Sequence, residues 1–258
     1  MSTVAPPELA PERTDAHHEA YFADQLDSNR EFWARFGRRP DLAGRKVLDL
    51  GCGHGAMTIE VAAEAQEAVG VDLHAERVRF ARRHLQRHHV ALAERVRFEL
   101  LDIAELDEDG TYDVVLSKDT FEHVSDMAGM LRELHRLLVP GGEIWAGFSP
   151  LFHSPKGDHG RTGLRLPWAH VVLPRAVVLR AAARHRGHPV RSLDDLGLNG
   201  MTARQFRRHV AEAGLELVDV RYNRSDKRLV RALGRVRRFG PLETPATVGV
   251  YAVLRRPR

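Results

Sequence analysis

Short apolar runs of strand length alternate along this chain with longer segments whose apolar residues recur at helical spacing. Seven of these runs predict strands, at residues 46–49, 68–72, 95–100, 112–117, 143–148, 215–221 and 247–254. Helical spacing follows at residues 56–65, 75–87, 127–138 and 202–213. The alternation indicates an α/β fold of Rossmann-like type, a seven-stranded, mainly parallel sheet with helices on both faces. Ligands of such sheets bind at the carboxyl ends of the strands.

Two segments lie outside this alternation. Residues 1–40 contain Tyr21, Phe22, Phe32 and Trp33 at approximately helical spacing, which predicts one or two helices packed over the carboxyl edge of the sheet. Residues 149–200 interrupt the pattern after the fifth strand, and so long an excursion in a compact domain is usually functional. We therefore expect an N-terminal helical cover at 1–40 and a main domain at 41–258, in which 149–200 is an inserted lid that binds substrate.

Composition agrees with a globular protein. The chain has 258 residues, of which 43% are hydrophobic and 29% are charged. No apolar run is long enough for a membrane span, and several acidic residues occupy the first 30 positions in place of a basic start and an apolar run. The single cysteine, Cys52, excludes an intrachain disulfide. These features predict a cytoplasmic protein without a membrane partner.

The charge balance is weakly basic, with a formal net charge of +4 and a pI of about 9.6. The densest basic run is residues 221–238. Within it Arg224, Arg228, Arg231 and Arg235 fall at helical spacing, which is typical of a solvated helix face. A patch that faces an anion is the other interpretation of this run. Sequence alone leaves both open.

The candidate chemistry begins with the glycine-rich turn at residues 49–55, which follows the first strand and opens a helix. Glycines let the backbone approach a ligand closely, and free N–H groups at a helix start favour a carboxylate or a phosphate. Gly51 and Gly53 with Ala56 also fit the dinucleotide fingerprint, and Asp72 lies about 20 residues later, where a ribose-binding acid is expected. The turn alone is therefore ambiguous.

Acidic residues at successive strand ends distinguish a dinucleotide site from a site for another nucleoside. Asp49 precedes the first glycine, Asp72 ends the second strand, Asp102 follows the third, and Asp119 follows the fourth. Asp49 is placed to orient an ammonium group through the turn, Asp72 to bind two ribose hydroxyls, and Asp102 with Ile103 to meet an adenine. Such a set suits a cationic amino-acid nucleoside better than a diphosphate.

The set of motifs resembles the class I S-adenosylmethionine-dependent methyltransferases, in particular type 11-like enzymes that act on small molecules. The motifs are VLDLGCGHG, VDLH, LLDIAEL, YDVVLSKDTFEHV and LLVPGGEIW, which together cover residues 45–148. The resemblance implies S-adenosyl-L-methionine as the cofactor. It also implies a set of cofactor-binding residues: Asp49, Gly51, Cys52, Gly53, Gly55, Asp72, Leu73, Asp102, Ile103 and Lys118.

Methyl transfer depends mainly on orientation, and it needs a base only when the acceptor must lose a proton. Histidine is the natural candidate because its unperturbed pKa is near 6.5. His123 follows the fourth strand, close to the expected methyl position, whereas His159 and His170 lie in the insert. We predict that these three supply the catalytic groups, although each can instead be a structural hydrogen-bonding residue. His153, Asp158, His159 and His170 match no regular metal-ligand spacing, so we expect no metal.

The acceptor is expected to be a small polar molecule, methylated at a hydroxyl or an amine, in secondary metabolism or glycan biosynthesis. Enzymes that methylate nucleic-acid bases usually carry an Asn/Asp-Pro-Pro-aromatic motif after the fourth strand, where residues 117–120 here read Ser-Lys-Asp-Thr. No nucleic-acid partner is therefore expected. The alternatives are attack on the aminobutyryl arm of the cofactor, or a regulatory module that only binds it. The oligomeric state is left open.

Overall fold

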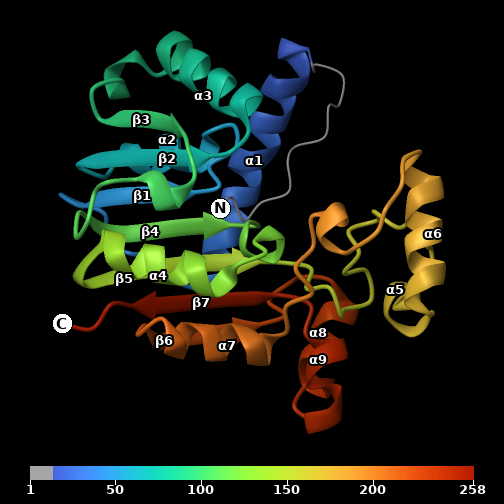
Figure 1. The fold of residues 1–258 in the computed structure, drawn as a ribbon. Coiled ribbons are helices and arrows are strands. Elements are labelled where there is room, and N and C mark those ends of the chain that lie inside the picture. The colour runs from blue at the N-terminus through green and yellow to red at the C-terminus, as the bar shows by residue number, and fades with distance from the viewer. Residues whose placement is uncertain (1–13) are drawn as a thin grey trace.

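The computed structural model describes residues 14–258, and the predicted cover at 1–40 therefore lies partly outside the described residues. One sheet of seven strands forms its centre (Figure 1). The strands are β1 (Lys46–Leu50), β2 (Glu67–Asp72), β3 (Val96–Leu100), β4 (Tyr112–Lys118), β5 (Leu138–Phe148), β6 (Glu216–Tyr222) and β7 (Val250–Arg255). Their order is β3-β2-β1-β4-β5-β7-β6. All pairings are parallel except those of β7, which is antiparallel to both β5 and β6. The predicted Rossmann-like α/β fold is confirmed.

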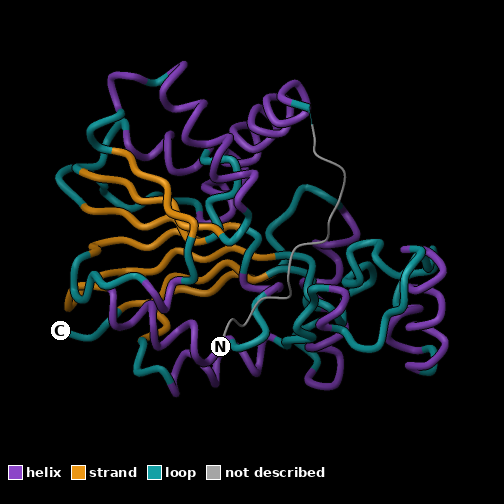
Figure 2. The backbone as a smooth tube through the Cα atoms, turned by 45° about the horizontal axis from the view of Figure 1, so that its top comes forward, coloured by secondary structure: helices purple, strands orange, loops and turns teal. Residues whose placement is uncertain are grey.

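Helices cover both faces of this sheet, because successive side chains of each buried strand point to opposite sides. Val47 packs on one face with α1 (Asp15–Phe36), α2 (Ala56–Ala62) and α3 (Ala75–His88). Leu48 packs on the other face with α4 (Met127–Leu137) and α7 (Ala203–Glu212). Figure 2 shows the strands as a single layer between these helices. The apolar runs in the sequence are continuous for this reason, since both faces of the strands are buried.

The N-terminal segment forms one long helix in its described part, and this helix does more than cover the carboxyl edge. Its C-terminal half buries Phe32 and Phe36 against Trp145 of β5 and Tyr251 of β7. Its N-terminal half lies beside α2 and α3, where Tyr21 reaches the carboxyl ends of the strands. Helix α1 therefore crosses one face of the sheet, and its N-terminal half reaches the predicted carboxyl edge.

Two strand boundaries differ from the sequence pattern by more than one residue. Strand β5 begins at Leu138, which pairs with Tyr112, so the Pro-Gly-Gly segment lies inside the strand as an irregularity. Strand β7 begins at Val250 and not at Thr247. The reason is Asn223, whose side-chain Oδ1 accepts hydrogen bonds from the backbone N–H groups of Val248 and Gly249. These two residues therefore bond to a side chain instead of a neighbouring strand.

The insert at 149–200 contains α5 (Ala169–Val172) and α6 (Arg175–Arg186), which lie beyond the carboxyl ends of the parallel strands (Figure 1). It has a small apolar core of its own, which includes Ala182, Leu196 and Leu198. The remaining helices are α8 (Arg228–Val236) and α9 (Glu243–Ala246), between β6 and β7. Within residues 14–258, no helix is both long enough and apolar enough to cross a membrane.

Candidate active site

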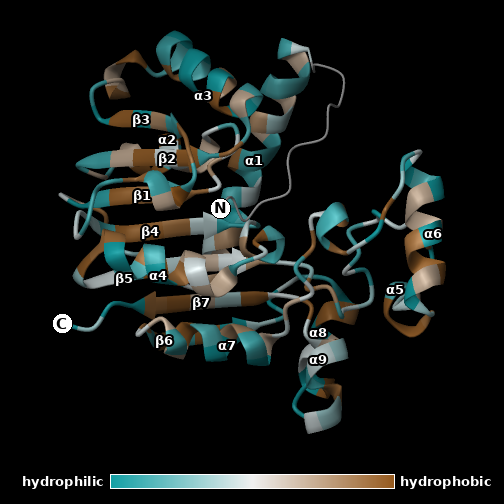
Figure 3. Ribbon diagram, in the orientation of Figure 1, coloured by the Kyte–Doolittle hydropathy of each residue, from teal (hydrophilic) through white to brown (hydrophobic). Residues whose placement is uncertain are grey.

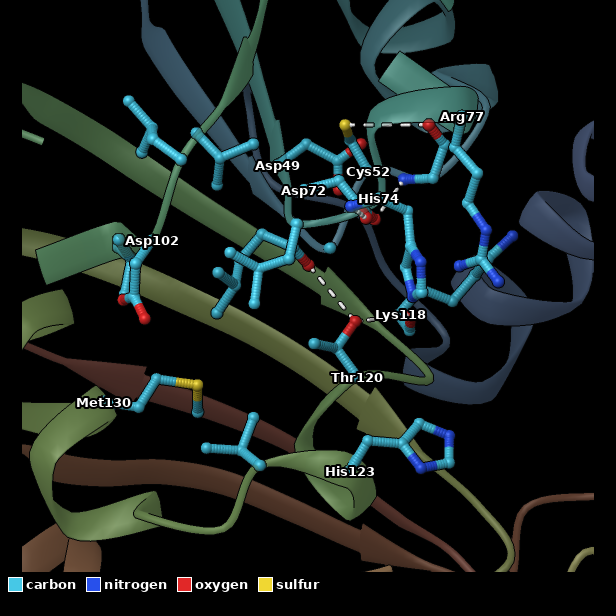
Figure 4. A pocket seen from close by; sticks show the side chains of 18 of the residues that line it. Asp49, Cys52, Asp72, His74, Arg77, Asp102, Lys118, Thr120, His123 and Met130 are labelled. Carbon is cyan, nitrogen blue, oxygen red and sulfur yellow. Dashed lines mark hydrogen bonds between the residues drawn. The ribbon is translucent and has the colours of Figure 1, made fainter. Parts of the chain in front are cut away.

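A cavity of about 890 Å³ opens at the carboxyl ends of β1, β2, β3 and β4 (Figure 4). This is the topological switch point of the sheet, because β2 and β4 lie on opposite sides of β1 in the strand order. Loops after these strands supply the walls, and α1 adds Tyr21 and Gln25. The volume is of the size that holds a small organic ligand.

The glycine turn forms the floor of this cavity, and its three glycines have different tasks. Gly51, Gly53 and Gly55 all have positive φ, of 75°, 54° and 85°. A Cβ at Gly51 would lie 2.2 Å from Thr120 Oγ1, and one at Gly55 would lie 2.6 Å from the ring of Phe98. A Cβ at Gly53 would meet no protein atom within 4 Å, although Gly53 lines the cavity. Gly51 and Gly55 are therefore needed for packing, and Gly53 keeps space open for a ligand.

Asp72 lies at the end of β2 with its carboxylate beside the turn. Its Oδ2 accepts a hydrogen bond from Gly53 N–H at 2.9 Å, and its Oδ1 accepts one from His74 N–H at 2.8 Å. Each oxygen keeps a further lone pair. The arrangement fixes a carboxylate at the cavity wall that can accept from two adjacent hydroxyls, as predicted for ribose.

Asp49 is buried below the turn. Thr58 Oγ donates to its Oδ2 at 2.6 Å. Burial raises the pKa of Asp49 to about 6, and the Thr58 hydrogen bond and the charge of Lys118 oppose that rise. The carboxyl group is therefore buried and bonded to α2 at the edge of the cavity, and the predicted role of orienting an ammonium group through the turn stays a prediction.

Asp102 and Ile103 form the wall below β3. Asp102 Oδ1 accepts from Ala104 N–H at 3.1 Å, so this residue also caps a short helix. Lys118 lines the cavity, but its ammonium group points to α1 and donates to Ser28 Oγ at 2.8 Å and Asn29 Oδ1 at 2.6 Å. Burial lowers the pKa of Lys118. Its side chain thus holds β4 against α1, and its backbone remains beside the cavity.

Nine of the ten cofactor-binding residues that we predicted line the cavity, and the exception is Gly55, which faces Phe98. The predicted cofactor-binding set leaves out several further lining residues, of which only Tyr21 and Asp119 were noted in the sequence: Tyr21, Gln25, His54, Arg77, Asp119, Thr120 and Met130. The helical spacing of aromatic residues in α1 was a signal for Tyr21. Arg77 and Met130 carried no such signal, because they lie on helices whose orientation the sequence does not give.

Asp119 is the most unusual of the missed residues. It follows β4 with a φ of 52°, a left-handed conformation that is uncommon outside glycine. Its backbone N–H donates to Gly147 O at 2.8 Å, which holds this conformation in place. Burial raises the pKa of the Asp119 carboxyl, and the charges of Lys118 and Arg35 oppose the shift. A strained acidic residue at the cavity wall fits a functional position.

His123 and His159 come together where the insert meets the end of β4. His123 is on the short 3-10 helix η3 (Phe121–His123), and its ring lies 5.2 Å from the ring of His159. The Nδ1 of His123 is 2.7 Å from Gly197 O, and the Nε2 of His159 is 2.9 Å from Pro150 O. Burial lowers the pKa of His123, and it lowers that of His159 to about 4. Of the two, only His123 lines the cavity.

His170 occupies a different place. It is 5% exposed and does not line the cavity, and its Nε2 lies 2.6 Å from Phe152 O. Its Nδ1 is 4.0 Å from Asp158. These contacts are those of a residue that holds the insert together, so the structure does not bring His170 to the cavity with His123.

We expected no metal centre because the histidines of the insert have no regular metal-ligand spacing. In the described part of the chain, the one group of three ligands that come within 4.8 Å of one another is Glu19, His84 and His88, at the seam of α1 and α3. The insert's His153 bonds instead toward Gly200 O at 3.2 Å. The insert histidines therefore do not converge on a common point.

Comparison with known proteins identifies the family of this chain. A model of a methyltransferase domain matches residues 41–148. The ubiquinone biosynthesis O-methyltransferase of Pseudomonas aeruginosa (strain LESB58) is 33% identical over 164 residues, which cover 60% of this chain and 67% of the relative. The chain belongs to the class I S-adenosylmethionine-dependent methyltransferases.

Two further comparisons concern the sequence and the fold. The ubiquinone biosynthesis O-methyltransferase of Acinetobacter baumannii (strain ACICU) is 31% identical over 150 residues, and the match spans 57% of this chain and only 61% of the relative. The geranyl diphosphate C-methyltransferase of Streptomyces coelicolor A3(2) is 16% identical with a TM-score of 0.61, over 96% of this chain and 86% of that one. This second likeness concerns the fold.

The methyltransferase cofactor, S-adenosylmethionine, fits the residues that are present. Open space at Gly53 and the fixed carboxylate of Asp72 match a nucleoside that lies against the turn. Seven carboxyl side chains line the cavity, against three arginine or lysine side chains. This acidic excess favours a ligand that carries positive charge, as a sulfonium amino acid does.

Proposed function

We propose that this protein transfers a methyl group to a hydroxyl of a small polar molecule. S-adenosylmethionine supplies an electrophilic methyl on its sulfonium when it is bound. Asp49, Asp72, Asp102 and the turn would hold this cofactor, and the loop after β4 would present the acceptor. Both ubiquinone biosynthesis relatives carry O-methyltransferase in their names, which supports an oxygen acceptor.

The observation that carries the proposal is the orientation of His123. A carbonyl oxygen only accepts hydrogen bonds, so the contact with Gly197 O assigns the proton to Nδ1. The Nε2 then carries a lone pair, and in residues 14–258 no side chain or backbone group donates to it. Its lowered pKa keeps the ring neutral at pH 7. A neutral imidazole at the cavity wall is suited to accept the hydroxyl proton as the new bond forms.

The insert at 149–200 is proposed as the substrate-binding segment. Asn199 Nδ2 donates to the carbonyl oxygens of Phe121 and Val124, at 2.7 Å and 2.9 Å, which fastens the end of the insert to the loop that carries His123. This contact holds the end of the insert next to the proposed base, although no insert residue lines the cavity itself. His159, which touches the His123 ring, is proposed to position it.

An amine acceptor remains the second form of this proposal, because the same base can take a proton from an ammonium group. We place the reaction in secondary metabolism or glycan biosynthesis, with no nucleic-acid substrate, since the pattern at 117–120 lacks the motif of base methylation. We also place the protein in the cytoplasm, where its free Cys52 would stay reduced.

Product analysis tests the proposal. The purified protein is incubated with methyl-labelled cofactor and a panel of matched acceptors that carry a hydroxyl, an amine or neither. S-adenosylhomocysteine together with a labelled methyl ether supports the proposal. Methylthioadenosine signals attack on the aminobutyryl arm, and binding without any product signals a regulatory module. Either of these two outcomes contradicts methyl transfer to a hydroxyl.

A further inference from the structure

The basic run at 221–238 takes no part in the candidate active site, and the structure shows it as a strongly amphipathic helix. Helix α8 has no buried residue along its whole length. Leu229, Leu233 and Val236 fall on one side at helical spacing, and Leu229 is 60% exposed. A surface helix normally turns such a stripe toward the core. Here Leu229 and Val236 are exposed, and Leu233 is half-buried.

The opposite side of α8 is uniformly basic. Arg228, Arg231 and Arg235 share this side and are exposed, and no acidic residue lies within the helix. In the described part of the chain, none of these three arginines takes part in an ion pair. Arg237 differs, because it lies over the Tyr222 ring at 3.6 Å and pairs with Glu243 at 3.0 Å. Arg237 therefore anchors the helix, and the other three remain available to an external anion.

The apolar stripe continues beyond α8. Phe239 is 68% exposed and Leu242 is 44% exposed, directly after the helix. Trp168, at the start of α5, donates from its indole nitrogen to Pro245 O at 3.1 Å, and so brings the insert next to this segment. Figure 3 shows hydrophobic patches on α5, α6 and α8, which lie on one side of the molecule beyond the carboxyl ends of the strands. Nine of the thirteen exposed large hydrophobic side chains of residues 14–258 belong to the insert or to this segment.

We propose that residues 228–242 bind to the surface of an anionic phospholipid bilayer, with α8 lying flat in the interface. Leucine and phenylalanine side chains would enter the boundary between headgroups and acyl chains, and the arginines would reach lipid phosphates. The exposed apolar residues of α5 and α6 would form a second contact. The protein would then lie on the bilayer without crossing it. This proposal departs from the expectation of no membrane partner, which rested on the absence of a spanning segment, and no described helix is long and apolar enough to span.

Charge complementarity selects this partner over the other occupants of an apolar face. A second copy of the chain packed on the apolar stripe would cover the leucines but would leave the arginines of both copies without a counter-charge. A nucleic acid would satisfy the arginines but would leave Leu229 and Phe239 in water. An anionic bilayer satisfies both sides of the helix. The proposal is independent of the proposed methyl transfer, because it concerns residues outside the cavity.

Vesicle sedimentation tests the proposal with the full chain. One set of vesicles contains phosphatidylcholine alone, and the other contains phosphatidylcholine with phosphatidylglycerol. We expect binding to the second set, at least about tenfold stronger than to the first, and weakening as salt is raised. Absence of binding, or equal binding to the two sets, overturns the proposal.

Two pairs of variants and two matched controls make the test specific. Arg231→Glu with Arg235→Glu removes the charge, and Leu229→Ser with Phe239→Ser removes the apolar contact; each pair should weaken binding at least about tenfold. The charge control is Arg79→Glu with Arg87→Glu on α3, and the apolar control is Val90→Ser, at a side chain that is 68% exposed. The controls should bind vesicles as the wild type does. Equal loss in a control overturns the proposal.

Two further measurements separate membrane binding from misfolding and from self-association. Melting temperature and affinity for S-adenosylhomocysteine should be unchanged in every variant, since none of the altered residues lines the cavity. Sedimentation velocity without lipid should give the same mass for the wild type and both α8 pairs. If the wild type forms a larger species that is absent only in the α8 variants, this face binds a second copy of the chain, and the proposal is overturned. Vesicle binding without methyl transfer would sustain it while contradicting the proposed function.

Discussion

Asp72 accepts a hydrogen bond from the backbone N–H of Gly53 at 2.9 Å, and this contact joins the end of β2 to the turn after β1. The two residues are 19 positions apart in the sequence. Their contact fixes the carboxylate at the cavity wall next to the one glycine of the turn that leaves space for a ligand. The proposed recognition of a nucleoside would therefore depend on a contact between the end of one strand and the turn after its neighbour.

Replacement of Asp72 by Ala should weaken binding of S-adenosylhomocysteine by about 1.5–3 kcal/mol, because charge-assisted hydrogen bonds to hydroxyls are lost. Titration calorimetry measures the effect. Asp102→Ala is a useful comparison, since Asp102 also caps backbone at its strand end. Unchanged affinity in the Asp72 variant would remove this residue from the site.

Gly53→Val and Gly55→Val should fail for different reasons. A side chain at Gly53 extends into open cavity, so this variant should fold, with a modest cost for its φ of 54°, and lose cofactor binding. A side chain at Gly55 meets Phe98 at 2.6 Å, so this variant should lose stability first. Melting curves combined with calorimetry distinguish the two. A folded Gly53→Val protein with normal affinity would contradict the assignment of the turn.

Much of the cofactor side could be predicted because its signals are local. A strand, a glycine turn and an acidic residue at the strand end occur within a few positions of one another, and the parallel sheet brings such ends together. Asp49, Asp72 and Asp102 all line the cavity for this reason.

The acceptor side could not be predicted as well because its contacts are distant in sequence. His123 meets Gly197 across 74 positions, and Lys118 meets Asn29 across 89. Spacing does not show where the insert histidines lie: none of His153, His159 and His170 lines the cavity, and His170 is turned into the insert. Asp119 was noted only as a strand-end acid, and its positive φ is visible only in the fold.

Replacement of His123 by Ala should lower turnover by about 10²–10⁴ and leave cofactor affinity nearly intact, because the general base is lost while the turn is untouched. Single-turnover rates and calorimetry on the same preparation measure both. His170→Ala is the matched comparison: the loss of this buried, hydrogen-bonded side chain should lower the melting temperature and change the rate little at a temperature where the variant is folded. Equal turnover in wild type and His123→Ala would leave positioning alone as the source of catalysis.

The turnover rate of the wild type should be level near neutral pH and should fall only in acid. Burial lowers the pKa of His123 below 6.5, so the neutral form that accepts a proton persists at pH 6.5. Turnover should therefore stay level from about pH 8 to about pH 6.5 and decline only at lower pH. The profile of kcat under saturating cofactor checks this. A decline centred above about pH 7 would assign the limiting proton to another group.

The last prediction concerns stability and follows from His159. Its pKa is lowered to about 4 in the folded protein, chiefly by burial and next by the neighbouring His123, whereas an unfolded histidine titrates near 6.5. Between these values the unfolded chain binds a proton that the folded chain does not. The free energy of unfolding should therefore fall as pH is lowered from 6.5 toward 4, and this residue should account for about 2 kcal/mol between pH 7 and pH 5.

The variant His159→Gln isolates this contribution, because glutamine can also donate to Pro150 O but does not titrate. Denaturant unfolding at pH 7 and pH 5 should show a loss for the wild type that is about 2 kcal/mol larger than the loss for the variant. Asp49 works in the opposite sense, since its raised pKa of about 6 makes the folded protein bind a proton more readily in the same window. Its effect is common to both proteins and cancels in the difference. Identical pH dependence in the two proteins would show that folding does not lower the pKa of His159, and would contradict its burial as a neutral ring beside His123.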